Sequence, residues 1–474
     1  MKQRMISLCL LLCMLLLAGC GPKSEPQTQP APTSVASETT LPPGTTAPAE
    51  SLPEPNEYHE VFTSTDGTVE FTLSATLPEI TPLPVIQAEP RDLTESDIQR
   101  IGQALFGDAV FYREEEMFEE EYTREELQKK LDLWALYDTP EEMAKLYPYR
   151  DREEDPYLER EAEVVNSFIE EYSAYLPDCP EEKNDPVCDW TFQNGQIATQ
   201  VEINGIPYSF SGSKIGGNKN TIWAYISPGA GPGQIENDHY EALLCRVEEP
   251  TADQVAAVKA KAETILADME IGNWQVTTCE VSSTDMGKEG QPLLSYKIQI
   301  RALPVFNGFP TMPWMTTDYR WAGGEGVQME FAPDGTLLFC KVEQNYRAAA
   351  SATFDMLPME QVLARVKEEL SEQTITDFGY SEETIVSLRQ ETGEEIICKA
   401  AVFELKYGLL RTNSTIPGGG WQYVPAVMVF GEPSLCVKST GEEKMTFEDY
   451  FGNTAPRRFA CIHAVDGTAV EFPD

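Results

Sequence analysis

Apolar residues recur along this chain with two periods, and each change of period marks an expected element. From Tyr58 to Ala75, and again from Asp189 onward, apolar and polar side chains alternate, as in the segment 69–73, which is typical of half-buried β-strands. Asn204-Gly205 between two such runs favours a hairpin turn. Apolar residues at helical spacing predict three helices between these strands, over residues 94–106, 114–136 and 159–176.

The C-terminal half shows the same order of elements twice. Thr251-Ala252-Asp253 begins an amphipathic helix, and strands are expected at 274–281, 293–303, 326–331 and 336–344. A second helix over 357–370 precedes strands at 385–389, 396–407, 421–430 and 459–472. The recurrence predicts two related modules, 249–348 and 352–474, each a helix packed on an antiparallel sheet.

The expected fold class is therefore α+β with several domains. The N-terminal domain, 57–248, combines a hairpin, a helical region and antiparallel strands, and the two tandem helix-plus-antiparallel-sheet modules follow it. The triplet Asp-Gly-Thr occurs at 66, 334 and 466, each time between two segments that are expected to form a hairpin. Asp-Gly suits such a turn because it tolerates positive φ.

The N-terminus carries a targeting pattern. Lys2 and Arg4 precede an apolar run, Met5–Leu17, which is too short to span a bilayer. Leu17-Ala18-Gly19-Cys20 then resembles the lipobox of bacterial lipoproteins. The resemblance implies that residues 1–19 are a cleaved signal peptide and that the thiol of Cys20 carries a diacylglycerol. It places the protein at the cell membrane, lipid-anchored on the extracytoplasmic face.

Residues 20–56 are predicted to be a disordered tether. They are rich in Pro, Thr and Ser and hold too few apolar residues to bury a core. The formal net charge of the chain is −43. Such a charge repels phosphate backbones and favours cationic ligands or basic peptides, so no nucleic-acid partner is expected.

The cysteine pattern leaves two alternatives open. Eight cysteines follow Cys20, and most lie in apolar, strand-like segments where a thiol behaves as a small buried hydrophobe. Cys179 and Cys188 flank a polar, proline-containing loop and can either form a local disulfide or stay as free thiols. With no CxxC pair, neither a zinc site nor a thioredoxin-type redox motif is supported, and no metal or cofactor is predicted.

Catalytic motifs are not found. The three histidines, His59, His239 and His463, stand apart, and there is no HExxH or Gly-x-Ser-x-Gly pattern. The many carboxylates neither support nor exclude a glycosidase pair, because that pair is set by spatial separation. We therefore predict no catalytic residue and expect a protein that is not an enzyme.

Aromatic residues gather in two Gly- and Pro-rich loops. The first loop holds Phe306, Phe309, Trp314, Tyr319 and Trp321, and the second holds Trp421 and Tyr423. Such rings either pack over an open sheet end or form a shelf for a sugar or peptide. If the two modules are related, the loops lie at corresponding positions and form one paired groove. The candidate ligand-binding residues are Phe309, Trp314, Tyr319, Trp321, Trp421 and Tyr423.

The last module also carries a resemblance. Glu404–Tyr407, Trp421–Val429 and Ile462–Thr468 look like the final strands of YycH/YycI-type regulators and related PepSY-like modules. That resemblance implies an extracytoplasmic module, one helix on a small antiparallel sheet, acting by contact rather than catalysis. The chain departs from the pattern at His463, where Asn is usual, and in the 418–420 insert. As a whole it resembles large uncharacterised lipoproteins of Gram-positive anaerobes, which implies location only.

The expected function is a non-catalytic binding or regulatory module of the cell envelope, anchored in the membrane through Cys20. Its partner is expected to be an envelope protein, a peptide or a glycan. A solute- or glycan-binding receptor lipoprotein is the alternative, and an envelope hydrolase comes third.

Overall fold

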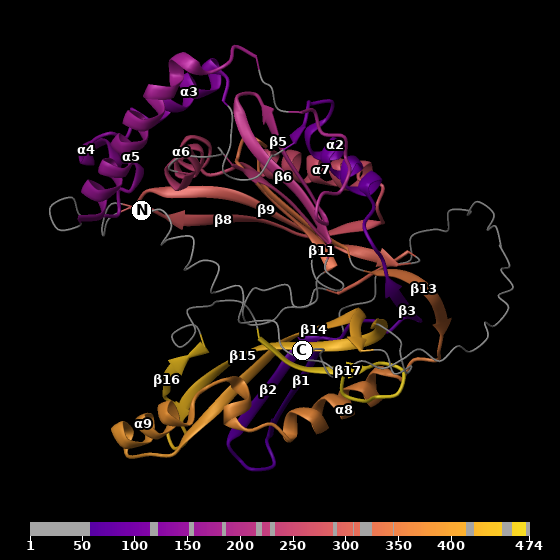
Figure 1. The fold of residues 1–474 in the computed structure, drawn as a ribbon. Helices are drawn as coiled ribbons and strands as arrows, with labels where there is room; N and C mark the ends of the chain where they lie inside the picture. Colours follow the sequence, from indigo (N-terminus) through magenta and orange to yellow (C-terminus); the bar gives the residue numbers. More distant parts are fainter. Residues whose placement is uncertain are drawn as a thin grey trace, which may run out of the picture. The chain divides into compact units, whose positions relative to one another are not determined.

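A computed structural model gives the arrangement of the elements (Figure 1). It describes residues 57–113, 122–150, 156–182, 186–214, 220–227, 233–287, 292–306, 308–312, 325–344, 346–413, 421–447 and 457–470. The predicted signal peptide, Cys20 and the predicted tether lie outside these ranges. The strands form two sheets, both rich in antiparallel pairs, and this confirms the predicted α+β class.

The first sheet joins both ends of the described chain, and we call it the terminal sheet. Its order is β1-β2-β14-β15-β3-β13, with β16 and β17 also paired to β15. The strands are β1 (Glu57–Thr63), β2 (Val69–Thr76), β3 (Pro84–Pro90), β13 (Tyr346–Thr353), β14 (Ile396–Asn413), β15 (Trp421–Val437), β16 (Glu443–Thr446) and β17 (Arg457–His463).

The predicted N-terminal hairpin is present, but it belongs to the terminal sheet. β2 pairs in parallel with β14, with Val69 opposite Cys398 and Leu73 opposite Val402. β3 pairs with β15 and β13. The predicted boundary that placed residues 57–90 with the segment up to 248 therefore differs from the structure. The apolar face of β2 is buried by the C-terminal module, because Val69, Phe71 and Leu73 are fully inaccessible there.

The second sheet, the central sheet, has the order β10-β9-β11-β12-β7-β6-β5-β4, with β8 paired to β9. Its strands are β4 (Tyr112–Arg113), β5 (Gln196–Ile203), β6 (Ile206–Lys214), β7 (Asn220–Ile226), β8 (Trp274–Asp285), β9 (Leu294–Phe306), β10 (Phe309–Pro310), β11 (Glu325–Phe331) and β12 (Leu337–Gln344). β12 pairs with β7, so this sheet runs across the predicted 248/249 boundary. Module 1 shares its core with strands that precede it.

The helices form three groups. They are α2 (Glu95–Phe106) and α7 (Ala252–Asp268) on the central sheet, α8 (Met359–Ser371) and α9 (Glu382–Thr392) with the terminal sheet, and α3 (Arg124–Trp134), α4 (Pro140–Leu146), α5 (Pro156–Tyr175) and α6 (Gly233–Cys245) in a core of their own. This last core, the helical cluster, is separate from those of the two sheets and lies beside the central sheet in Figure 1.

Local capping explains where several helices begin. Thr94, Thr123 and Thr251 each form a capping box with the residue three positions later. The described part of the helix predicted over residues 114–136 is α3, which begins at Arg124 because Thr123 caps it. Residues 385–389, predicted as a strand, lie in α9 instead. Ser381 caps that helix and Gly393, in the left-handed conformation, ends it, so the two signals outweigh the apolar pattern.

The three Asp-Gly-Thr triplets form the same turn. The carboxylates of Asp66, Asp334 and Asp466 accept from the amides two residues on, at 3.0, 2.8 and 3.0 Å. The second and third turns also rest on corresponding helix positions. A Cβ at Gly335 would face Val258 of α7, and one at Gly467 would face Arg365 of α8, each six residues after its helix begins. This equivalence favours the predicted relationship between the modules.

Candidate functional site

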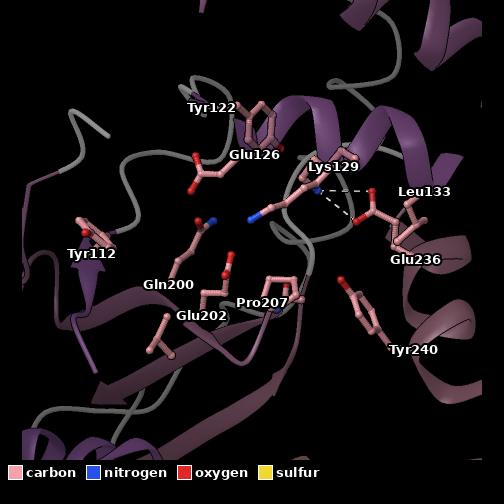
Figure 2. A pocket seen from close by; sticks show the side chains of 14 residues that line it. Tyr112, Tyr122, Glu126, Lys129, Leu133, Gln200, Glu202, Pro207, Glu236 and Tyr240 are labelled. Atoms are coloured by element: carbon pink, nitrogen blue, oxygen red, sulfur yellow. Dashed lines mark hydrogen bonds and ion pairs between the residues drawn. The ribbon is translucent and has the colours of Figure 1, made fainter. Parts of the chain in front are cut away.

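A cavity of about 150 Å³ opens between the helical cluster and the central sheet (Figure 2). We call it the α3–α6 pocket. One wall is the exposed side of α3, the opposite wall is β5 with the turn into β6, and α6 closes the inner end. The lining residues are Tyr112, Tyr122, Glu126, Lys129, Lys130, Leu133, Gln200, Val201, Glu202, Gly205, Pro207, Ser227, Glu236 and Tyr240.

A buried ion pair forms the inner end of the pocket. Glu236, on α6, is only 1% exposed, and its carboxylate lies 3.1 Å from the Nζ of Lys130. The indole N–H of Trp134 donates to the same carboxylate. The Lys130 ammonium also lies 5.2 Å from the centre of the Tyr122 ring. A buried carboxylate is tolerated only when it is paired and hydrogen-bonded, and both conditions are met here.

The outer walls carry charges of both signs. Figure 2 shows Lys129 extending from α3 toward Gln200 and Glu202 on β5. Lys129 pairs with Glu125 of its own helix at 2.9 Å, and that hydrogen bond raises the pKa of the ammonium. One oxygen of Glu126 accepts from the Thr123 amide at 2.9 Å as part of the helix cap. Most lining charges thus already have a partner within the protein.

Tyrosine rings join Leu133, Val201 and Pro207 in the apolar part of the pocket lining. Tyr112, Tyr122 and Tyr240 enter from β4, from the start of α3 and from α6, respectively. Burial raises the pKa of the Tyr240 hydroxyl, and the nearby carboxylates of Glu236 and Glu202 add to the effect. Tyr240 therefore stays protonated near neutral pH, as a ring with a hydrogen-bonding tip.

Local sequence explains how these groups are placed. Lys130 and Trp134 are four residues apart on α3, so both reach Glu236 from one helical face. On the opposite wall, the predicted Asn204-Gly205 turn is present, and both residues adopt positive φ, +53° and +80°. This tight turn brings Glu202 and Pro207 to the same side of the pocket.

The described aromatic residues of the predicted binding shelf do not line this pocket. Phe306, Phe309, Trp421 and Tyr423 do come together, in a small core between the two sheets, and the Phe306 and Tyr423 ring centres are 4.6 Å apart. The described ends of the two loops therefore meet, as the paired-groove hypothesis requires. Tyr423, however, is 2% exposed and packs as core. Trp314, Tyr319 and Trp321 lie outside the described residues.

The cysteines and histidines show structural contacts. Cys179 and Cys188 are both free thiols, so the local disulfide does not form; Cys188 packs in the central-sheet core and Cys179 against the helical cluster. The Nδ1 of His239 lies 2.8 Å from the Tyr137 hydroxyl, and that of His463 accepts from the Val465 amide. Burial lowers the pKa of both imidazoles. Cys20 lies outside the described residues.

Sequence reasoning missed the pocket because its residues come from five separate segments. One signal was visible: Glu236 stands one residue after Ile235, near the start of a helix whose last turn, Ala242–Cys245, is apolar. A carboxylate in that context needs a buried partner. Its partner, Lys130, is more than a hundred residues away and cannot be found from a local pattern.

Comparisons with known proteins add little. No protein-family model matches the chain, and the search of curated proteins gave no match. A solved structure of an uncharacterised protein from Eubacterium rectale ATCC 33656 matches 88% of this chain and 94% of its own, at 9% identity and a TM-score of 0.33. So low a score carries no inference. None of the described helices is both long and apolar enough to cross a bilayer.

Proposed function

We propose that this chain is a lipid-anchored, extracytoplasmic protein that binds a small solute in the α3–α6 pocket and acts without catalysis. The lipobox-like Leu17–Cys20 supports the location, and the acidic body supports a fold that stands off an anionic membrane. The single observation that carries the proposal is the half-open pocket with its mixed polar and aromatic lining.

The arrangement of charges favours binding over chemistry. The Glu236 carboxylate is held by Lys130 and Trp134, and one oxygen of Glu126 serves as a helix cap. A general base or a nucleophile needs an electron pair that is available to the substrate. Groups held in such internal pairs are instead suited to orient a ligand by hydrogen bonds.

The test is native mass spectrometry of the lipidated protein extracted from its own membrane. We expect a bound small molecule on the wild-type protein and its loss in Ser227→Phe, because that ring fills the pocket. Ser283→Phe, on the exposed edge strand β8, is the matched control and should keep the adduct. A wild-type protein without an adduct, or an adduct kept by Ser227→Phe, contradicts the proposal.

The location is tested separately. Cys20→Ser removes the only sulfur that the lipobox-like segment offers for acylation. The body should then appear in the medium or remain as the uncleaved precursor, without incorporated palmitate. Unchanged membrane attachment of this variant contradicts the proposed anchor.

A second candidate function, contact with a partner protein, is favoured by β8. Among the described strands β8 pairs only with β9, and most of its side chains are exposed. An open edge of this length can accept an extended segment of another chain as an added strand. Thr278→Pro on β8 should weaken capture of such a partner from the envelope and leave the pocket adduct unchanged.

A further inference from the structure

We propose that the α3–α6 pocket is selective for a neutral sugar of monosaccharide size. The inference rests on the proposed solute-binding function and specifies its ligand class. Three features of the pocket carry it: its size, the internal pairing of its charges, and the mixture of tyrosine rings with donors and acceptors.

Size limits the ligand first. Pockets for drug-sized molecules have volumes of roughly 300–1,000 Å³. The α3–α6 pocket, at about 150 Å³, is smaller. It matches a single sugar ring or an amino acid and excludes a bound oligosaccharide or peptide, apart from one terminal unit.

Charge pairing then argues for a neutral ligand. Lys130 is paired with Glu236 at 3.1 Å, and Lys129 with Glu125 at 2.9 Å. A ligand carboxylate would have to displace one of these carboxylates from its lysine and would also face Glu202. A ligand ammonium would compete with Lys130 for the buried Glu236. At Glu202 it would meet the Lys129 ammonium, with which that carboxylate already interacts. Either exchange replaces a formed ion pair with another of similar strength, so neither is strongly favourable.

The same groups suit hydroxyls well. A sugar hydroxyl both donates and accepts, so it can donate to Glu202 and accept from the Gln200 amide on the neighbouring wall. Hydrogen bonds to charged groups are the stronger ones, and they do not require the internal ion pairs to break. The three tyrosine rings offer apolar faces for the C–H side of a sugar ring.

The experiment is calorimetric titration of the full-length protein with a neutral panel: glucose, galactose, mannose and N-acetylglucosamine. Glucosamine and glucuronate provide a cation and an anion on a ring of similar size. We expect at least one neutral sugar to bind, and both charged sugars to bind on the order of tenfold more weakly or not at all.

Glu236→Gln supplies a readout that a structural defect would not produce. The amide keeps an acceptor for Trp134 but removes the carboxylate charge that Lys130 faces, so the pocket loses one negative charge. The order of affinities should reverse, with glucuronate binding more tightly than the neutral sugar. Glu142→Gln, which breaks an exposed ion pair with Lys145, is the matched control and should keep the wild-type order.

The outcomes separate this inference from the proposed function. Tightest binding of glucosamine or glucuronate by the wild-type protein overturns the neutral class and leaves the pocket as a binding site. No sugar binding, together with a pocket-dependent adduct in the mass spectrum, overturns the sugar assignment alone. No sugar binding and no adduct overturn both. An unchanged order of affinities in Glu236→Gln overturns the role of charge pairing.

Discussion

Glu236 shows how one residue joins two parts of the fold. Its carboxylate lies on α6, yet its partners Lys130 and Trp134 lie on α3, more than a hundred residues earlier. A charge this deeply buried is stable only while its partner is present. The pair therefore holds the two helices at a fixed distance and sets the inner end of the pocket.

Glu236→Ala should lower the free energy of unfolding by about 3–5 kcal/mol, because it removes the buried carboxylate that neutralises the Lys130 ammonium. Urea unfolding measures the loss as a shift of the midpoint. Glu142→Gln removes an exposed pair and should cost less than about 1 kcal/mol. Equal effects of the two variants would show that the buried pair does not stabilise the helical cluster.

Two half-buried histidines, His239 and His463, give stability a pH dependence. Burial lowers the pKa of His239 and His463 in the folded state, although Asp466, 3.4 Å from His463, acts in the opposite direction. The unfolded chain therefore binds protons more readily than the folded one. The contribution of these two histidines to the free energy of unfolding is therefore fully present above the unfolded pKa of about 6.5. It falls as the pH drops below that value.

Urea midpoints at about pH 7.5, 6.5 and 5.5 measure this fall, since the window brackets an ordinary histidine pKa. The double variant His239→Gln, His463→Gln removes both titrating groups and should flatten the profile across this window. Carboxylates with lowered pKa, such as Asp466, lose their contribution only at lower pH. An unchanged slope in the double variant would contradict the assignment to these imidazoles.

At the scale of elements, the parallel pairing of β2 with β14 is decisive. It joins residues 69–73 to residues 398–402, and β3 pairs with the first residues of β15 in the same sheet. The C-terminal module predicted at 352–474 is therefore not a self-sufficient unit. Without β1, β2 and β3, one edge of β14 and the apolar faces beneath it would be open.

A chain that begins at Arg91 tests this dependence. It lacks β1, β2 and β3, and we expect it to aggregate or to lose the terminal sheet, because Val69, Phe71 and Leu73 no longer fill that core. The soluble fraction and size-exclusion profile measure the effect. A chain that begins at Pro55 keeps these strands and should remain folded. A monomeric, folded 91–474 chain would contradict the expectation.

At the scale of the whole molecule, the net charge of −43 opposes folding through self-repulsion. Raising the salt concentration from about 0.01 to about 0.15 M shortens the screening length from about 30 to about 8 Å. The melting temperature should rise by roughly 1 °C or more, the shift expected for about 1 kcal/mol in a chain of this length. A neutral osmolyte at the same osmolarity is the control, and a fall with salt would show that surface ion pairs outweigh the repulsion.

Local sequence determined much of the secondary structure. Three capping boxes mark helix starts, alternating segments became strands, and the Asp-Gly-Thr triplets became turns, because each depends on residues only a few positions apart. The strand predicted at 385–389 is the exception. There a short apolar run fits either period, and the caps of α9 decided the outcome.

Tertiary structure decided the pairing of strands and the place of the pocket. No local pattern distinguishes β14 from any other apolar strand as the neighbour of β2, since pairing depends on which faces complement each other after the chain closes. The pocket combines β4, α3, the β5–β6 hairpin and α6 in the same way. The sequence by itself determined the local elements and predicted a location at the cell membrane through Cys20. Only long-range packing, which buries Glu236 against Lys130, created a candidate site.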